Sequence, residues 1–163
     1  PWARIDIRVG RIVDIVKHPN ADRLFIEQVD FGTGETRQII SGLVGVIDIE
    51  VLRGRLCVFF YNLKPANICK TLSQGMIMCG KHNDGECDIV RLVTPPEGAQ
   101  PGDRVFVDGI EAKPDEQLKA KDTVLPDVLS GLAVSGGRIL YKGAVAKVAA
   151  GELTVDLEQG IVS

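Results

Sequence analysis

Long apolar runs are missing from this chain of 163 residues. None approaches the roughly 18 consecutive apolar residues of a membrane-spanning helix, so we expect no membrane segment. Arg4, Asp6 and Arg8 interrupt the first apolar stretch, so we expect no secretory signal peptide there. With 45% hydrophobic and 25% charged residues, the composition is that of an ordinary globular protein.

Cysteine and histidine are scarce, with four and two copies. Cys57 lies in an apolar stretch and is predicted to be a small buried hydrophobic residue. Cys69, Cys79, His82 and Cys87 suggest a zinc site, but no CxxC pair accompanies them. We therefore favour reduced thiols, no bound metal and a cytoplasmic location over the zinc alternative.

The chain also lacks a recognisable catalytic motif. Its serines at 41 and 73 stand outside a G-x-S-x-G frame, and both histidines fall in predicted turns. The pair Gly32 and Gly34 has no third glycine and no following helix, so it indicates a hairpin turn and not a dinucleotide site. We expect a binding protein without a cofactor and keep an enzyme as the alternative.

Strand-like alternation is what the sequence does contain. In residues 4–17 the apolar side chains share one face. These are Ile5, Ile7, Val9, Val13 and Ile15. Gly10 marks an expected bulge. Five or six short strands separated by turn signals follow within residues 3–107. This pattern predicts an all-β fold, with a five-stranded barrel of the oligonucleotide-binding (OB) type at residues 1–107.

Residues 108–163 are predicted to form a C-terminal extension that packs on the barrel. Short strands joined by glycine turns are expected from residue 132 onward. A short helix is expected to begin at Pro114–Glu116, or to lie within Lys119–Leu125 before Pro126. A unit of about 55 residues would be only marginally stable alone, which favours packing against the barrel.

Charge is distributed unevenly between the two halves. Residues 1–82 hold 11 basic and 8 acidic residues, and residues 83–163 hold 8 and 14. The N-terminal half is therefore the candidate surface for an anionic partner, because barrels of this type bind nucleic acid with basic and polar side chains. The candidates are Arg8, Arg11, Arg37, Asn62, Lys64, Lys70, Ser73 and Gln74. Solvated surface residues without a ligand are the competing interpretation.

Four separated motifs in residues 17–76, KHPNAD, SGL, NLKP and SQGM, occur in an order that resembles a known family. The family is the tRNA-binding domain of the endothelial-monocyte-activating-polypeptide type, which is appended to some methionyl- and tyrosyl-tRNA synthetases and their auxiliary proteins. The resemblance covers residues 3–107. Residues 108–163 look like the extension of eukaryotic members, which replaces a dimer interface of bacterial relatives. The resemblance thus implies a monomer.

The resemblance implies non-catalytic binding of tRNA with little sequence preference, in support of a synthetase catalytic domain or complex. Its tRNA-contacting motif falls on Ser73 and Met76, with Asn62 and Lys64 beside it. Arg37 and Ser41 are expected neighbours. Met76 either supports a base or packs in the core.

Two departures from the family reduce the expected affinity for tRNA. Where animal members carry a lysine-rich run, this chain reads QLKAKDTV and includes Asp122. The turn near His82 also carries Asp84 and Glu86. Fewer phosphate contacts weaken binding and flatten its salt dependence. A protein-interaction, scaffold or cytokine-like module with weak tRNA affinity is therefore kept as the alternative.

Overall fold

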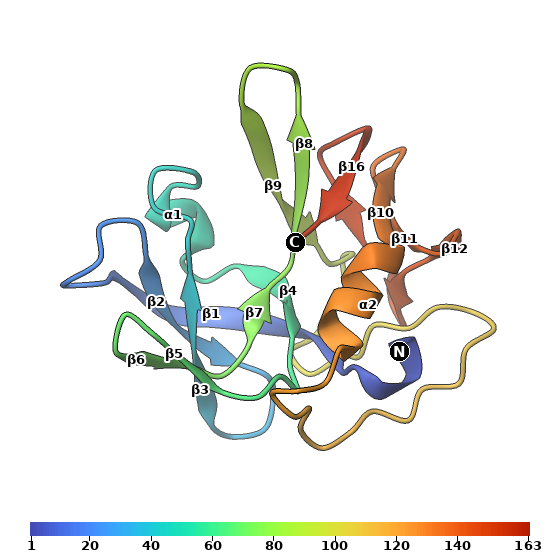
Figure 1. Ribbon diagram of the computed structural model, residues 1–163, viewed down its shortest axis with the longest axis horizontal. Helices are drawn as coiled ribbons and strands as arrows, with labels where there is room; N and C mark the ends of the chain where they lie inside the picture. The colour runs from blue at the N-terminus through green and yellow to red at the C-terminus, as the bar shows by residue number, and fades with distance from the viewer.

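The computed structural model describes residues 1–163, and most of its regular structure is β-strand (Figure 1). One antiparallel sheet has the strand order β3-β2-β1-β4-β7. Its strands are β1 (Ile7–Lys17), β2 (Phe25–Asp30), β3 (Thr36–Ser41), β4 (Leu56–Phe60) and β7 (Met76–Ile77). A hairpin of β5 (Ala66–Ile68) and β6 (Thr71–Ser73) packs beside β3, and helix α1 (Ile49–Leu52) connects β3 to β4. The predicted all-β class is confirmed.

The C-terminal residues build a second, closed barrel. Its six strands follow the order β10-β16-β8-β9-β15-β11, and β11 pairs back with β10. They are β8 (Cys79–Asn83), β9 (Asp88–Thr94), β10 (Leu132–Ser135), β11 (Arg138–Tyr141), β15 (Thr154–Val155) and β16 (Gln159–Val162). Strand β12 (Ala144–Val145) adds to β11, and β13 (Lys147–Val148) pairs with β14 (Gly151–Glu152). Strands from both sides of the predicted boundary at residue 107 thus share one sheet.

Strand β1 lies between two partners, β2 and β4, one on each edge. Its first half pairs with β4 and its second half with β2. A bulge lies at Val13, between Ile12 and Asp14, three residues beyond the predicted position. The bulge buries Ile12 and leaves Val13 48% exposed, so the prediction that Val13 shares the buried face is wrong. Gly10 instead permits close packing, since a Cβ there would lie 2.6 Å from the Val29 side chain.

The helix of the extension differs from both predicted positions. Helix α2 runs from Val124 to Gly131 and includes Pro126, while Pro114–Glu116 is not helical. Proline is tolerated here because the amides of the first helical turn have no partner within the helix. The prediction that the helix ends before Pro126 is therefore wrong, because Pro126 lies in the first turn of α2.

Two apolar clusters fill the molecule. The larger contains 23 buried residues and joins the start of the chain, β4 and the C-terminal strands. The ring of Trp2, in the short 3-10 helix η1 (Trp2–Arg4), lies 4.8 Å from that of Tyr141. The smaller cluster of 13 residues lies under the first sheet. The extension is thus attached through a shared core, which is favourable because apolar burial scales with area.

A buried amide adds a polar link between the two parts. The side chain of Asn62 is 2% exposed. Its Nδ2 donates to the carbonyls of Arg4 at 3.0 Å and Asp115 at 2.9 Å, and its Oδ1 accepts from the Asp6 amide at 2.9 Å. The prediction that Asn62 is presented outward is therefore wrong, because its polar atoms are consumed by three backbone segments.

We predict that Asn62→Ala lowers the free energy of unfolding by about 2–3 kcal/mol, because it removes three hydrogen bonds and strands buried backbone groups. Urea unfolding followed by circular dichroism measures the change. The control is Asn67→Ala on exposed β5, which is expected to change stability little. Equal midpoints for the two variants would contradict this role of Asn62.

Candidate nucleic-acid interface

Two guanidinium groups stack on the ring of Tyr61, at the end of β4. The Cζ of Arg37 lies 3.6 Å and that of Arg8 lies 3.9 Å from the ring centroid. Arg37 also donates from Nη1 to the Tyr61 carbonyl at 2.7 Å. The ring of Phe31 also packs against that of Tyr61 in an edge-to-face arrangement, with the centroids 4.8 Å apart. Cation–π attraction and packing therefore hold both arginines in place at one end of the first sheet.

Strand pairing explains why these side chains meet. The Tyr61 amide donates to the Asp6 carbonyl, which continues the β1–β4 ladder one step past β4. Arg8 is two residues further along β1 and so lies on the same face as Asp6. Arg37 enters from β3, opposite Val29. Three strands thus deliver one residue each to the stack.

The two arginines differ in their partners. Arg8 makes a bidentate pair with the buried carboxylate of Asp6, at 3.0 and 2.9 Å. Burial works against the charge of Arg8, but hydrogen bonding and attraction to Asp6 prevail and raise the pKa of its guanidinium. Arg37 has no carboxylate within 4 Å. The charge of Arg37 is therefore the uncompensated one.

A cavity of about 330 Å³ opens beside this stack. It is lined by Asp6, Arg8, Arg37, Tyr61, Arg104, Pro114, Asp115 and Glu116. Two of the lining carboxylates already have cationic partners, since Asp6 pairs with Arg8 and Asp115 with Arg4 at 2.8 Å. Arg104 is 56% exposed and reaches Asp6 only at 3.6 Å. Arg37 and Arg104 are thus positioned to bind an added anion.

Two of the predicted site residues brace the backbone. Ser73 is 4% exposed; its hydroxyl accepts from the Ile40 amide and donates to the Gly75 carbonyl, both at 3.0 Å. The side-chain carbonyl of Gln74 accepts from the Gln38 amide at 3.0 Å. This stretch is bonded to β3, so the prediction that Ser73 is presented outward is wrong.

Ser41 and Met76 share a different cavity, of about 410 Å³, whose wall also includes Lys81. Ser41 is 5% exposed and donates to Glu27 at 3.2 Å. Met76 is half-buried and packs against the larger apolar cluster while it lines this cavity. The contact with the apolar cluster agrees with the interpretation of Met76 as a core residue, while a contact of Met76 with a base stays a prediction.

The remaining predicted residues are exposed and do not line the cavity beside Tyr61. Lys64 follows Tyr61 by three positions. Lys70 occupies the tip of the β5–β6 hairpin, where Cys69 and Lys70 have φ values of 49° and 67°. Arg11 lies further along β1 and donates to the Gly54 carbonyl at 2.8 Å. Of the predicted residues, only Arg8 and Arg37 line that cavity.

Sequence reasoning missed Tyr61, Asp6 and Arg104. Tyr61 directly precedes the NLKP motif, and a tyrosine at a strand end beside basic residues is a usable signal for a stacking platform. Asp6 interrupts an apolar stretch of the sequence, yet it is only 5% exposed. Arg104 is brought to β1 by an isolated bridge to Arg8 that no local pattern predicts.

The structure contains no assembled site for metal binding or for thiol chemistry. No group of three or more histidine, cysteine, aspartate or glutamate side chains is gathered for a metal. All four cysteines are free. Burial raises the pKa of the Cys57 and Cys79 thiols to about 12, which makes both unreactive. No helix has the length and apolar character needed to cross a bilayer.

Comparison with known proteins identifies the family. Residues 7–104 match the family model described as "Putative tRNA binding domain". The C-terminal domain of p43 from Plasmodium vivax superposes with a TM-score of 0.92 and 29% identity, over 100% of this chain and 99% of that one. A methionyl-tRNA-synthetase-related protein from Pyrococcus horikoshii gives a TM-score of 0.57 and 33% identity, over 63% and 90%.

Among relatives in sequence, cytoplasmic tyrosine–tRNA ligase of Danio rerio is 43% identical over 82% of this chain and 25% of its own length. Aminoacyl tRNA synthase complex-interacting multifunctional protein 1 of Cricetulus griseus is 37% identical over 90% and 40%. Cytoplasmic methionine–tRNA ligase of Arabidopsis thaliana is 43% identical over 80% and 16%. The chain thus spans less than half of each of these relatives.

The chain belongs to this family of tRNA-binding domains, which confirms the resemblance inferred from the motifs. It is a binding domain homologous to domains carried by tyrosine– and methionine–tRNA ligases and by a synthetase-complex protein. The pairing of a half-buried tyrosine with an unpaired arginine is consistent with that class.

Glu27 is fully buried, and one of its carboxyl oxygens has no hydrogen-bond partner. Burial raises its pKa from 4.5 to about 8, against a smaller opposing effect of the hydrogen bond from Ser41. The folded protein thus keeps Glu27 protonated at a pH where the unfolded chain has lost that proton. The contribution of Glu27 to stability is then greatest below about pH 4.5 and is lost as pH rises toward 8.

We predict that Glu27→Gln stabilises the fold at pH 8 and flattens this decline, which for one proton is at most about 1.4 kcal/mol per pH unit. Urea midpoints measured between about pH 5 and 8 test it. Exposed Glu35→Gln is the control and should keep the wild-type pH dependence. An unchanged pH slope in Glu27→Gln would show that Glu27 is not the titrating group.

Proposed function

We propose that the chain binds tRNA at the Tyr61 end of the first sheet, as an appended or auxiliary domain of a cytoplasmic aminoacyl-tRNA synthetase. The observation that carries this proposal is Arg37, which is stacked on Tyr61 without a carboxylate partner. Such a group binds phosphate with little loss of side-chain entropy, because the ring already fixes its orientation. The role is non-catalytic: a tethered domain raises the local concentration of tRNA at a synthetase active site.

The chemistry of the site favours recognition of shape over sequence. Arg37 and Arg104 beside the cavity, with Lys64 close by in sequence, offer charge to phosphates and carry no base-reading amide. Asn62 and Ser73, the side chains suited to base edges, have their hydrogen bonds committed inside the fold. We therefore expect binding of many tRNAs with similar affinity.

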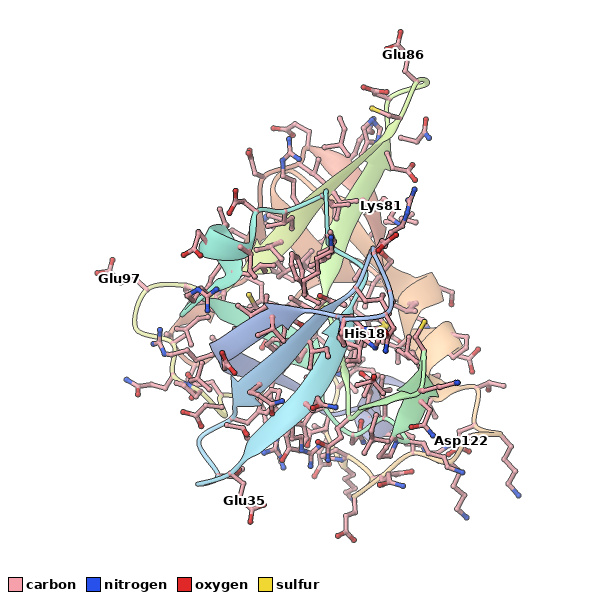
Figure 2. All side chains as sticks on the ribbon, turned by 90° about the vertical axis from the view of Figure 1, so that its left-hand side faces the viewer. His18, Glu35, Lys81, Glu86, Glu97 and Asp122 are labelled. Atoms are coloured by element: carbon pink, nitrogen blue, oxygen red, sulfur yellow. The ribbon has the colours of Figure 1, made fainter.

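The acidic half supports this placement. The β8–β9 turn holds Asp84 and Glu86, and Asp88 begins β9 directly after it. Amides of Cys87 and Glu86 lower the pKa of the Asp84 carboxyl, so the turn stays negative. Glu86 lies at one tip of the molecule, far from Glu35 at the other (Figure 2). Arg37 follows Glu35 by two residues, which supports a tRNA surface remote from the acidic turn.

A monomer is proposed on the basis of strand pairing. Strands β8 and β9 pair with each other, and their outer edges are taken by β16 and β15. An exposed strand edge is a common site for association between copies, and the extension covers these two edges. This is the role that a substitute for a dimer interface would have.

A scaffold module with weak tRNA affinity is the alternative, and the excess of acidic residues in positions 83–163 favours it. The two functions differ in a measurable way, because a scaffold would bind a synthetase in equal amounts without binding tRNA at low salt.

We predict that Arg37→Ala weakens tRNA binding several-fold and reduces the slope of log affinity against log salt by about 0.9, the value for one lost phosphate contact. Fluorescence anisotropy with labelled bulk tRNA over a salt series measures both. The affinity of Arg37→Lys for tRNA should lie between those of the wild type and Arg37→Ala, since an ammonium keeps the charge but loses planar stacking on Tyr61.

The matched control is Arg53→Ala, an exposed arginine paired with Glu50 beside α1. It should retain the wild-type affinity and slope. Equal losses in Arg37→Ala and Arg53→Ala would indicate a diffuse charge effect and refute the localised site.

A further inference from the structure

A third cavity, of about 380 Å³, is lined by residues from the segment around α1 and from strand β9. We call it the α1–β9 groove. Its lining residues are Val46, Ile47, Asp48, Val51, Arg55, Val90, Arg91, Leu92, Thr94 and Asp156. Val46 and Val51 at its wall are 50% and 47% exposed. Exposed aliphatic side chains around a concave site are typical of interaction surfaces.

The groove contains two arginines without carboxylate partners. Arg55 donates from Nη2 to the Thr94 hydroxyl at 3.1 Å, while its Nε is buried and has no partner. Arg91 donates only to the carbonyl of Val90. Neither forms an ion pair within 4 Å. Both guanidinium groups keep further N–H donors that no protein carboxylate accepts from, so an incoming carboxylate is a favourable partner for them.

The acidic residues in the wall do not meet this need. Asp48 is committed to α1, where its side chain accepts from the Glu50 amide at 2.8 Å. Asp156 lies in the wall without an ion pair to either arginine. An adjoining cavity of about 450 Å³ shares Val46 and Ile47 with the groove and adds Lys17 and Phe25. The concave surface thus continues with more apolar and cationic groups.

The lining favours a peptide over a nucleic acid as the occupant. Single-stranded nucleic acids bind where bases stack on aromatic rings, and no aromatic residue lines the α1–β9 groove. Aliphatic walls with two cations instead match an aliphatic side chain next to a carboxylate. The groove is also distant from the Tyr61 stack: Arg55 precedes β4 and Tyr61 follows it, so about 20 Å of extended strand separates them.

We propose that the α1–β9 groove binds a protein partner through a peptide segment that carries a glutamate or aspartate beside leucine, isoleucine or valine. The carboxylate pairs with Arg55 and Arg91, and the aliphatic side chain packs on Val46, Val51 and Val90. This surface is separate from the proposed tRNA surface, so both ligands are bound together. The peptide-binding proposal can therefore fail while the tRNA-binding proposal holds, and the reverse.

The test is a titration of the ¹⁵N-labelled domain with the peptide acetyl-Leu-Glu-Leu-Leu-amide, followed by NMR. The matched probe replaces Glu by Gln. We expect saturable shifts at the Val46, Val51, Arg55 and Val90 signals and at least ten-fold weaker binding of the Gln peptide. Charge-assisted hydrogen bonds account for a difference of that order.

Variants make the result specific. Arg55→Met and Arg91→Met should each weaken binding of the Glu peptide. Val51→Ser should weaken binding of both peptides. Arg53→Ala, outside the lining, should leave the affinity for both peptides unchanged. Addition of tRNA should leave the peptide shifts in place. Equal affinity of the two peptides, shifts away from the groove, no saturation at millimolar peptide, or displacement of the peptide by tRNA or oligouridine would each overturn the proposal.

Discussion

The side-chain amide of Asn62 is the contact on which the arrangement depends. It binds backbone groups of Arg4, Asp6 and Asp115, and so joins the start of the chain, the end of β4 and the extension. Its neighbour Tyr61 is thereby fixed, and the ring in turn orients Arg8 and Arg37. Buried polar networks of this kind specify one geometry because every alternative strands a donor or an acceptor. Asn62, which links the parts of the fold, and Tyr61, which carries the proposed tRNA surface, are thus neighbours in sequence at the end of β4.

A second consequence concerns where partners can bind. The extension closes β8 and β9 into a barrel, which covers their edges and holds the acidic turn at a tip of the molecule. One end of β4 carries the Tyr61 stack and the other leads back to Arg55 and the α1–β9 groove. The two proposed surfaces lie at opposite ends of β4, so we expect that an RNA and a protein partner can be bound at once. Both surfaces carry arginines without carboxylate partners, but aromatic stacking marks the first surface and aliphatic side chains mark the second.

Much of the fold was predictable from the sequence because strand alternation and glycine turns are local signals. The β2–β3 and β8–β9 hairpins follow from such turns, and the all-β class follows from them. Other features depend on contacts between distant residues. The bulge after Ile12, the helix through Pro126 and the closed second barrel are set by tertiary packing. The motifs identified the family correctly, yet polarity alone misjudged Asn62 and Ser73. A polar side chain in a binding motif is as well suited to bracing a loop as to touching a ligand.

The most direct test of the account is a photo-cross-linking map of the protein bound to tRNA that contains 4-thiouridine. Mass spectrometry then identifies the cross-linked peptides. The account predicts cross-links within the peptides that contain Arg37, Tyr61 to Lys64 and Arg104, and none in the β8–β9 turn or at α1. Cross-links concentrated around Glu86 or Val51 would contradict the central claim that tRNA binds at the Tyr61 end of the first sheet.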